Sequence, residues 1–406
     1  MLLKGWLAAA TFLVLAATPA SAQETRAEVV AQQRADKAAQ LQPYEAKGLE
    51  KALLWFEETD PLEKIAPHNG FFVQYGYTGK PVGSGIAFGG GWRHDLLNRN
   101  ARVTLEAGHS VRGYRMVRAD FALPRLLDER LELGVDGSYR YHPQEDFYGL
   151  GFATHSEDRV SFRFRAPEVQ GRAVLKPADW LNAGVRVARM NVSVGSGTDS
   201  RFPSIEERFT EAVAPGLTEQ PDYLYMDLFA TLDTRDQPGN ARDGVYVGLL
   251  WRRHNDLNLE RFNFDSVDVD VQHFLPIFDK KRVFAARFLL MTTTAGEGHE
   301  VPFYFRPTVG GSDTLRSAAD FRFRERNAAV ANFEYRWEAF SGLDMALFTD
   351  FAAVDPRLAG LEFADIRGAY GIGLRFNTYQ AVFLRLDVAA GGSEGIRTFL
   401  KFSKAF

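Results

Sequence analysis

The chain has 406 residues, of which 25% are charged, and a formal net charge of −4 at pH 7. This balance excludes the basic surface typical of nucleic-acid-binding proteins and the composition of a disordered chain. The sequence contains no cysteine, which excludes thiolate metal sites, catalytic thiols and disulfide bonds.

The first 22 residues have the pattern of a secretory signal peptide. Lys4 supplies a positive start, residues 6–17 form an apolar run, and Ala20-Ser21-Ala22 supplies the small residues of a cleavage site. We therefore predict that residues 1–22 are removed. No later stretch has the roughly 18 apolar residues that a membrane-spanning helix needs.

Residues 23–68 differ in composition from everything that follows them. They are rich in Ala, Glu, Gln and Lys, and Pro43 divides two stretches of helical pattern. In the second stretch Leu49, Leu53 and Phe56 recur at helical spacing. We predict a helical segment that packs on the rest of the protein, lies in the periplasm or plugs a pore.

From residue 69 onward, apolar and polar residues alternate with a period of two. Leu131, Leu133 and Val135 alternate with Glu132 and Asp136, which places apolar residues on one face of a strand and charges on the other. Every such segment carries charges on its polar face, and a small core cannot bury so many of them. A polar lumen with a lipid-facing exterior accommodates them.

Sixteen segments alternate in this way, and the connections between them are alternately short and long. They span about residues 69–78, 83–94, 100–110, 113–123, 130–141, 158–175, 181–193, 222–233, 243–254, 261–274, 282–294, 328–339, 342–352, 366–377, 380–390 and 395–406. An even number of strands with short periplasmic turns is typical of outer-membrane barrels, and lipid excludes an open sheet edge. We predict an all-β fold, a 16-stranded antiparallel transmembrane β-barrel over residues 69–406.

The last strand ends with aromatic and apolar residues on one face. Leu400, Phe402 and the terminal Phe406 resemble the C-terminal recognition signal of outer-membrane barrels. We therefore predict that the protein lies in the bacterial outer membrane.

Residues 307–327 form the longest polar interruption between two alternating segments, and a loop of this length in a compact fold is usually functional. The loop contains Gly310-Gly311-Ser312-Asp313-Thr314-Leu315-Arg316. Three other motifs accompany it: residues 147–151, Phe-Tyr-Gly-Leu-Gly; residues 233–236, Asp-Thr-Arg-Asp; and residues 334–337, Glu-Tyr-Arg-Trp, with Phe-Thr-Asp at 348–350.

Together these motifs resemble those of the BamA/TamA outer-membrane assembly barrels, the bacterial surface antigen family. The resemblance implies that the loop motif of Gly310, Gly311, Leu315 and Arg316 folds back into the barrel. It also implies that Arg316 pairs with acidic residues of the inner wall, for which Glu334 and Asp350 are the candidates. The residues Asp233, Arg235 and Asp236 resemble the family's periplasmic turn motif.

The residue pattern supports the same pairing independently. Glu334 belongs to the polar series of its strand with Asn332 and Arg336, so it should point into the lumen. An arginine inserted there needs such acceptors. Ser317 and Ala318 stand where the family has a glycine and an aromatic residue.

The resemblance implies a protein that assists the insertion or translocation of protein or lipid at the outer membrane. The family also carries periplasmic polypeptide-transport modules, which we expect to be absent here because residues 23–68 show no strand pattern. The alternative is a passive or helix-plugged channel. An outer-membrane enzyme ranks third, because no nucleophile and base can be placed together.

We predict no catalytic residue, no cofactor and no metal site. The expected partners are outer-membrane lipids and lipopolysaccharide, the barrel-assembly machinery during biogenesis, and an unidentified periplasmic partner. No nucleic-acid partner is expected.

Overall fold

The computed structural model describes residues 26–40, 47–59, 69–75, 85–361, 365–378, 380–392 and 394–401. The predicted signal peptide, Phe402 and Phe406 lie outside these residues. The chain divides into two compact units, one ending at Gly48 and the other beginning at Leu49.

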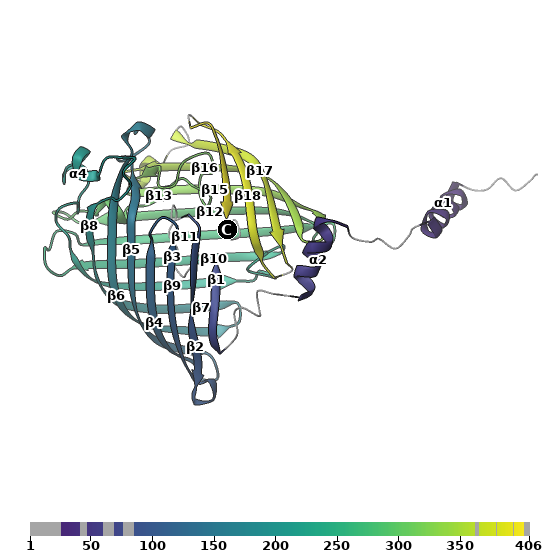
Figure 1. Cartoon of the computed structure of the whole chain (residues 1–406), viewed down its shortest axis with the longest axis horizontal. Coiled ribbons are helices and arrows are strands. Elements are labelled where there is room, and N and C mark those ends of the chain that lie inside the picture. Colours follow the sequence, from purple (N-terminus) through teal and green to yellow (C-terminus); the bar gives the residue numbers. More distant parts are fainter. Residues whose placement is uncertain are drawn as a thin grey trace, which may run out of the picture. The chain divides into compact units, whose positions relative to one another are not determined.

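The second unit is a single large antiparallel sheet (Figure 1). Its strands are β1 Gly70–Tyr75, β2 Ala87–Leu96, β3 Ala101–Ser110, β4 Arg115–Leu126, β5 Leu131–Phe147, β6 Val160–Ala178, β7 Leu181–Asn191, β8 Ser193–Ser196, β9 Asp222–Asp233, β10 Gly244–Asp256, β11 Phe264–Ile277, β12 Arg282–Ala295, β15 Asn327–Phe340, β16 Leu343–Asp355, β17 Arg367–Asn377, β18 Val382–Ala390 and β19 Ile396–Lys401. A separate hairpin pairs β13 Thr308–Val309 with β14 Phe323–Arg324.

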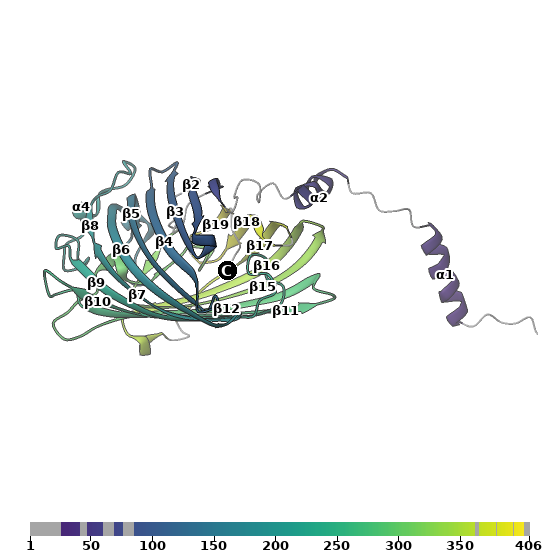
Figure 2. The ribbon, with the colours of Figure 1, turned by 90° about the horizontal axis from the view of Figure 1, so that it is seen from below.

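Around the sheet each strand pairs with the next one along the chain, from β1 with β2 to β18 with β19, except that β7 pairs with β9, β8 pairs with β6, and β12 pairs with β15. Because β7 and β8 pair with successive parts of β6, they are two halves of one interrupted strand. The 17 strands of the described sheet therefore form sixteen crossings of the wall. Figure 2 shows the same sheet as a curved wall. The predicted 16-stranded barrel is confirmed.

The two faces of the wall differ as the alternation predicts. On β16, Leu347 and Phe351 are 49% and 40% exposed, whereas Phe348 and Asp350, which alternate with them, are buried. Burial of the polar series and exposure of the apolar series is the reverse of a soluble sandwich. It is the arrangement of a strand between lipid and a filled lumen.

Helices account for little of the structure. They are α1 Arg26–Gln40, α2 Leu49–Thr59 and α4 Ile205–Arg208. In the described parts of the chain, no helix combines the length and the apolar character needed to cross a bilayer. Leu53 of α2 is buried, and its Cβ would lie 2.8 Å from a Cβ built on Gly342, in the turn between β15 and β16. This contact places α2 at the end of the barrel that carries the short turns.

The opposite end carries the long connections, which contain structure that the alternation did not predict. β5 continues past residue 141 to Phe147, because an irregularity between His142 and Glu145 keeps it paired with β6. The connection 197–221 contains α4. The burial of aromatic rings explains why these long connections are structured.

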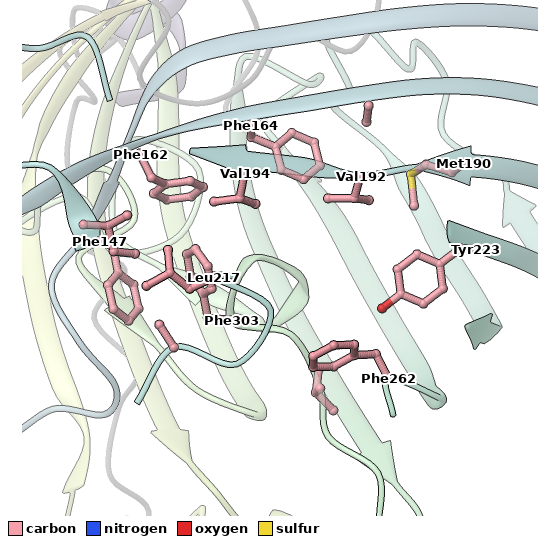
Figure 3. Packing of buried hydrophobic residues seen from close by; sticks show 14 of the residues in the cluster. Phe147, Phe162, Phe164, Met190, Val192, Val194, Leu217, Tyr223, Phe262 and Phe303 are labelled. Atoms are coloured by element: carbon pink, nitrogen blue, oxygen red, sulfur yellow. The ribbon is translucent and has the colours of Figure 1, made fainter. Parts of the chain in front are cut away.

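These rings form an apolar cluster at the long-connection end, which we call the external core. Its buried members are Phe147, Val160, Phe162, Phe164, Ala166, Ala188, Met190, Val192, Val194, Ile205, Ala214, Leu217, Tyr223, Tyr225, Phe262, Phe264, Val301 and Phe303. The ring of Phe303 packs 5.1 Å from that of Phe147 and 4.9 Å from that of Phe162, centroid to centroid (Figure 3). The external core ties together segments that are far apart in the sequence.

Candidate functional site at the inward loop

The connection between β12 and β15, residues 296–326, is the inward loop. Near its start, Val301 and Phe303 are anchored in the external core. The β13–β14 hairpin, in which Thr308 pairs with Arg324 and Val309 with Phe323, then forms a stem. The stem leads to a tip, residues 310–322, that packs against the inner wall. The anchor in the external core and the β13–β14 stem therefore position the tip.

Arg316 lies at the tip and is 2% exposed. Its Nε donates to Asp350 Oδ2 at 2.8 Å and its Nη2 to Asp350 Oδ1 at 2.6 Å. Its Nη1 donates to Glu334 Oε1 at 2.5 Å, and its backbone N–H donates to Asp350 Oδ2 at 3.1 Å. The structure therefore brings together the three residues that the sequence singles out. A bidentate contact of this kind fixes orientation as well as position.

The guanidinium of Arg316 is also covered by an aromatic ring. The centroid of the Phe348 ring lies 3.4 Å from its central carbon. The ring comes from β16 of the barrel wall, whereas the loop has Ser317 and Ala318 beside the arginine. The wall therefore provides a stacking partner for the guanidinium although the residues that follow Arg316 do not. A cation–π contact at a desolvated site is worth about 2 kcal/mol.

Three more wall arginines complete the charge network around Arg316. Arg336 donates to Glu334 Oε2 at 2.7 Å, and Arg375 donates to Glu334 Oε1 at 2.9 Å and to Asp387 Oδ1 at 2.5 Å. Arg385 lies 3.1 Å from Asp387 Oδ2. The buried guanidinium groups thus alternate in space with buried carboxylates. Burial alone would lower the pKa of Arg316, but Glu334 and Asp350 outweigh it and raise that pKa above its ordinary value.

The tip also contacts the last strands of the barrel. Asp313 accepts from Arg385 Nη2 at 3.0 Å and from Lys401 Nζ at 3.1 Å. Arg322 pairs with Glu394, in the connection between β18 and β19, and donates to Thr154 O at 2.7 Å. The inward loop therefore connects the wall from β15 to β19 and reaches the connection after β5.

The tip can pass this close to the wall because of its glycines. Gly310 has φ +126° and Gly311 has φ +87°, both in regions that L side chains avoid. A Cβ on Gly310 would lie 2.1 Å from Ala319 O. Gly311 N–H donates to Ala318 O at 3.0 Å, which closes the tip. Leu315 is buried in a second apolar cluster with Val309 and Phe323.

The predicted turn motif lies between β9 and β10. Arg235 donates to both carboxylate oxygens of Asp233, at 2.8 and 2.7 Å. Asp236 Oδ1 accepts from the backbone N–H of residues 237, 242 and 243, at 2.9, 3.0 and 3.2 Å. Lys280 of a neighbouring turn pairs with Asp236 at 3.0 Å. The motif is a folded turn at the same end of the barrel as α2.

Asp236→Asn is expected to lower the free energy of unfolding by about 1 kcal/mol at pH 7, because it removes the ion pair and weakens the turn hydrogen bonds. Burial alone would raise the pKa of Asp236, but the backbone N–H groups and Lys280 lower it overall. A carboxyl with a lowered pKa stabilises the fold above its unfolded pKa of about 3.9 and loses this contribution as pH falls through the folded value. Urea unfolding between pH 3 and 7 measures this contribution to the free energy of unfolding.

The difference between Asp236→Asn and the wild type should therefore shrink at the acid end of that range. Asp128→Asn is the matched control, because Asp128 lies exposed in the turn between β4 and β5. An equal loss of stability in both variants would contradict the assigned role of Asp236.

Of the predicted C-terminal signal, the structure describes Leu400 alone, which is 58% exposed on the outer face of β19. The sequence did not assign partners to Asp313, Arg322, Arg375, Arg385, Asp387 or Glu394. Their positions in the polar series of β17 and β18, and the charges beside Arg316, were the available signals. Which of these charges meet depends on the register of strands distant in the sequence.

Comparison with known proteins then decides the family. The family model of the Omp85 superfamily domain matches residues 95–399. The chain belongs to the Omp85 superfamily. No curated protein sequence matches this Omp85 chain.

Solved structures support the same fold. BamA from Haemophilus ducreyi lacking POTRA domains 1–3 is similar with a TM-score of 0.60 and 14% identity, over 82% of this chain and 69% of that one. CdiB from Acinetobacter baumannii is similar with a TM-score of 0.50 and 13% identity, over 82% of this chain and 58% of that one. At these identities the likeness shows the fold. As an Omp85 barrel, the protein is located in the bacterial outer membrane.

Proposed function

We propose that this Omp85 barrel assists the insertion or translocation of protein or lipid at the outer membrane. The observation that carries this proposal is the inward loop, held to β15 and β16 through Arg316 and to the β18–β19 region through Asp313 and Arg322. The loop stiffens the C-terminal half of the wall up to its last strand. Movement of the wall is then concentrated where the two ends of the sheet meet.

The ends of the sheet are suited to such movement. Among the described residues, β1 pairs with β2 and β19 with β18, and no pairing joins β1 to β19. A seam with few backbone hydrogen bonds has few of them to break. A substrate can then enter the bilayer beside the seam at a lower cost than through an unbroken membrane. Outer-membrane lipids, including lipopolysaccharide, would contact this region.

Two further partners belong to the same proposal. The barrel-assembly machinery would insert this chain during its own biogenesis. A periplasmic partner would deliver the substrate at the end of the barrel that carries α2 and the short turns.

The experiment uses proteoliposomes that contain the full chain. We expect them to accelerate the insertion of a small unfolded outer-membrane barrel at least fivefold over empty liposomes. Because the sequence has no cysteine, one cysteine placed in β1, at Phe71 or Val73, and one in β19, at Thr398 or Leu400, form a defined disulfide pair. Oxidation of a pair that crosslinks should abolish the acceleration, and a reductant should restore it.

Each single-cysteine variant, treated with the same oxidant, is the control. Liposomes with the wild-type barrel that insert the test substrate no faster than empty liposomes would disprove the proposed function. Acceleration that survives a complete crosslink would disprove the role of the seam.

A further inference from the structure

The inward loop packs along the C-terminal strands, and the opposite side of the lumen contains a cavity of about 310 Å³. Its charged lining comes from β4, β5, β6, β7 and β10. The residues are Arg118, Asp136, Arg140, Glu168, Arg186 and Arg252. The cavity shares no residue with the Arg316 site, so its chemistry needs its own explanation.

The arginines are the most exposed charged residues of this cavity, and the carboxylates beside them, including Glu168 at 11%, are more deeply buried. The side chains of Arg118, Arg140 and Arg186 are 26%, 34% and 31% exposed, although the barrel wall surrounds them. Asp136 and Asp227 are 3% and 0% exposed. A molecule in the cavity therefore meets guanidinium groups first. Such a surface attracts anions.

The direct ion pairs leave hydrogen-bond donors in excess. Asp227 alone serves both Arg186, at 3.0 Å, and Arg252, at 2.5 Å. Among the described residues, Arg118 donates through Nη2 to Asp136 at 3.0 Å and Arg140 through Nη2 to Glu168 at 2.6 Å, which leaves their Nη1 groups for a ligand. Asp268 on β11 lies near Arg252 but makes no ion pair with it in the described structure. The four guanidinium groups thus have capacity for a further acceptor.

Apolar groups close the external side of the cavity. Met190 and Tyr225 belong to the external core, and Phe305 packs against it (Figure 3 labels Met190). The ring of Tyr225 also lies 4.9 Å from the Arg252 guanidinium carbon, which holds that arginine in place. A ligand therefore meets a low-dielectric roof beside the arginines, which strengthens its electrostatic attraction.

Polar residues lead from the cavity toward the short-turn end. A small hollow lined by Thr104, Glu106, Arg118 and Asp120 adjoins it through Arg118. The next inward position of β3 is Arg102, which lines a wide mouth of about 750 Å³ together with Pro124, the inward residue after Ala122 on β4. That mouth also carries Arg99, Arg125, Arg130 and Lys176, and these basic residues outnumber its acidic residues Asp128, Glu129 and Asp179. Basic residues at the entrance of a cleft raise the local concentration of anions.

We propose that this cavity is a binding site for an oxyanion, the phosphate group of a small solute or of a lipid headgroup, which enters from the periplasmic mouth. Arginine presents a planar fork of N–H donors that matches phosphate geometry. The barrel would thus hold a phosphate-bearing ligand in its lumen, a property that goes beyond insertion or translocation and stands independently of it.

Calorimetric titration of the full chain, purified in detergent, with inorganic phosphate in chloride buffer tests the site. We expect saturable binding by the wild type and at least tenfold weaker binding by Arg140→Gln and by Arg186→Gln. Arg253→Gln is the matched control, because Arg253 follows Arg252 on β10, points to the outer face and pairs with Asp265. It should bind phosphate as the wild type does.

Three results would overturn the proposal: no saturable binding by the wild type, unchanged binding in both cavity variants, or an equal loss in Arg253→Gln. Heat-modifiable migration shows whether each variant is folded, and Arg140→Lys and Arg186→Lys replace any variant that is not. A parallel titration with dihexanoyl phosphatidic acid identifies the source of the phosphate. Tighter binding of this lipid supports a headgroup, and tighter binding of inorganic phosphate supports a free solute.

Discussion

Arg316→Ala is expected to lower the free energy of unfolding of the barrel by about 3–5 kcal/mol, the usual cost of removing one partner from a buried ion pair. The change leaves the fully buried Asp350 without its charged partner. Glu334 keeps Arg336 and Arg375, so most of the loss should come from Asp350. Urea unfolding in detergent, followed by tryptophan fluorescence, measures the effect.

Two further variants separate the buried pair from arginine chemistry in general. Arg316→Lys keeps the charge but loses the fork, so an intermediate loss is expected. Arg201 makes a comparable two-pronged contact with Asp199, at 2.8 and 2.7 Å, but on an exposed loop. Arg201→Ala should leave stability unchanged within error. A loss in Arg201→Ala as large as that in Arg316→Ala would contradict the importance of burial.

Gly310→Ala is expected to cost roughly 3 kcal/mol, because it combines backbone strain with overpacking. The new methyl group would lie 2.1 Å from Ala319 O, a backbone atom that cannot move without opening the tip. Displacement of the tip should also weaken the contacts of Arg316. We therefore expect a lower folded fraction in heat-modifiable electrophoresis and a lower midpoint in urea.

Gly298→Ala is the matched control for Gly310→Ala. Gly298 lies on the same inward loop with φ +76°, and a Cβ there would have nothing within 4 Å. Gly298→Ala therefore introduces the backbone strain of a positive φ but no steric clash. If Gly310→Ala is no more destabilising than Gly298→Ala, close packing of the tip does not hold the loop.

The sequence was sufficient to predict the barrel, because every strand of a wall between lipid and a polar lumen alternates apolar and polar residues. Val267 and Val269 on β11 and Leu347 on β16 follow that period, and the crossings fall where the alternation places them. The ends of the strands were harder to predict. β5 continues to Phe147 because the ring of that residue is completely buried by residues distant in the sequence. The local alternation of residues does not reveal such contacts.

The same limit applies to the Arg316 site. The loop motif and the polar series of β15 pointed to Arg316, Glu334 and Asp350, and the structure places these residues in contact. The aromatic partner was not predicted, because Phe348 belongs to the wall and meets the loop only in the folded barrel. Pairs such as Arg375 with Asp387 depend on the register between β17 and β18, which single-sequence patterns leave open.

The external core has a consequence for how the barrel reaches its final state. Its rings come from the ends of strands and from the connections beyond them, which must cross the membrane before they meet on the far side. Once together, they are removed from water, and a return passage would have to expose them again. Condensation of these loops therefore acts as a ratchet, which makes the insertion of this chain effectively one-way without a chemical energy source.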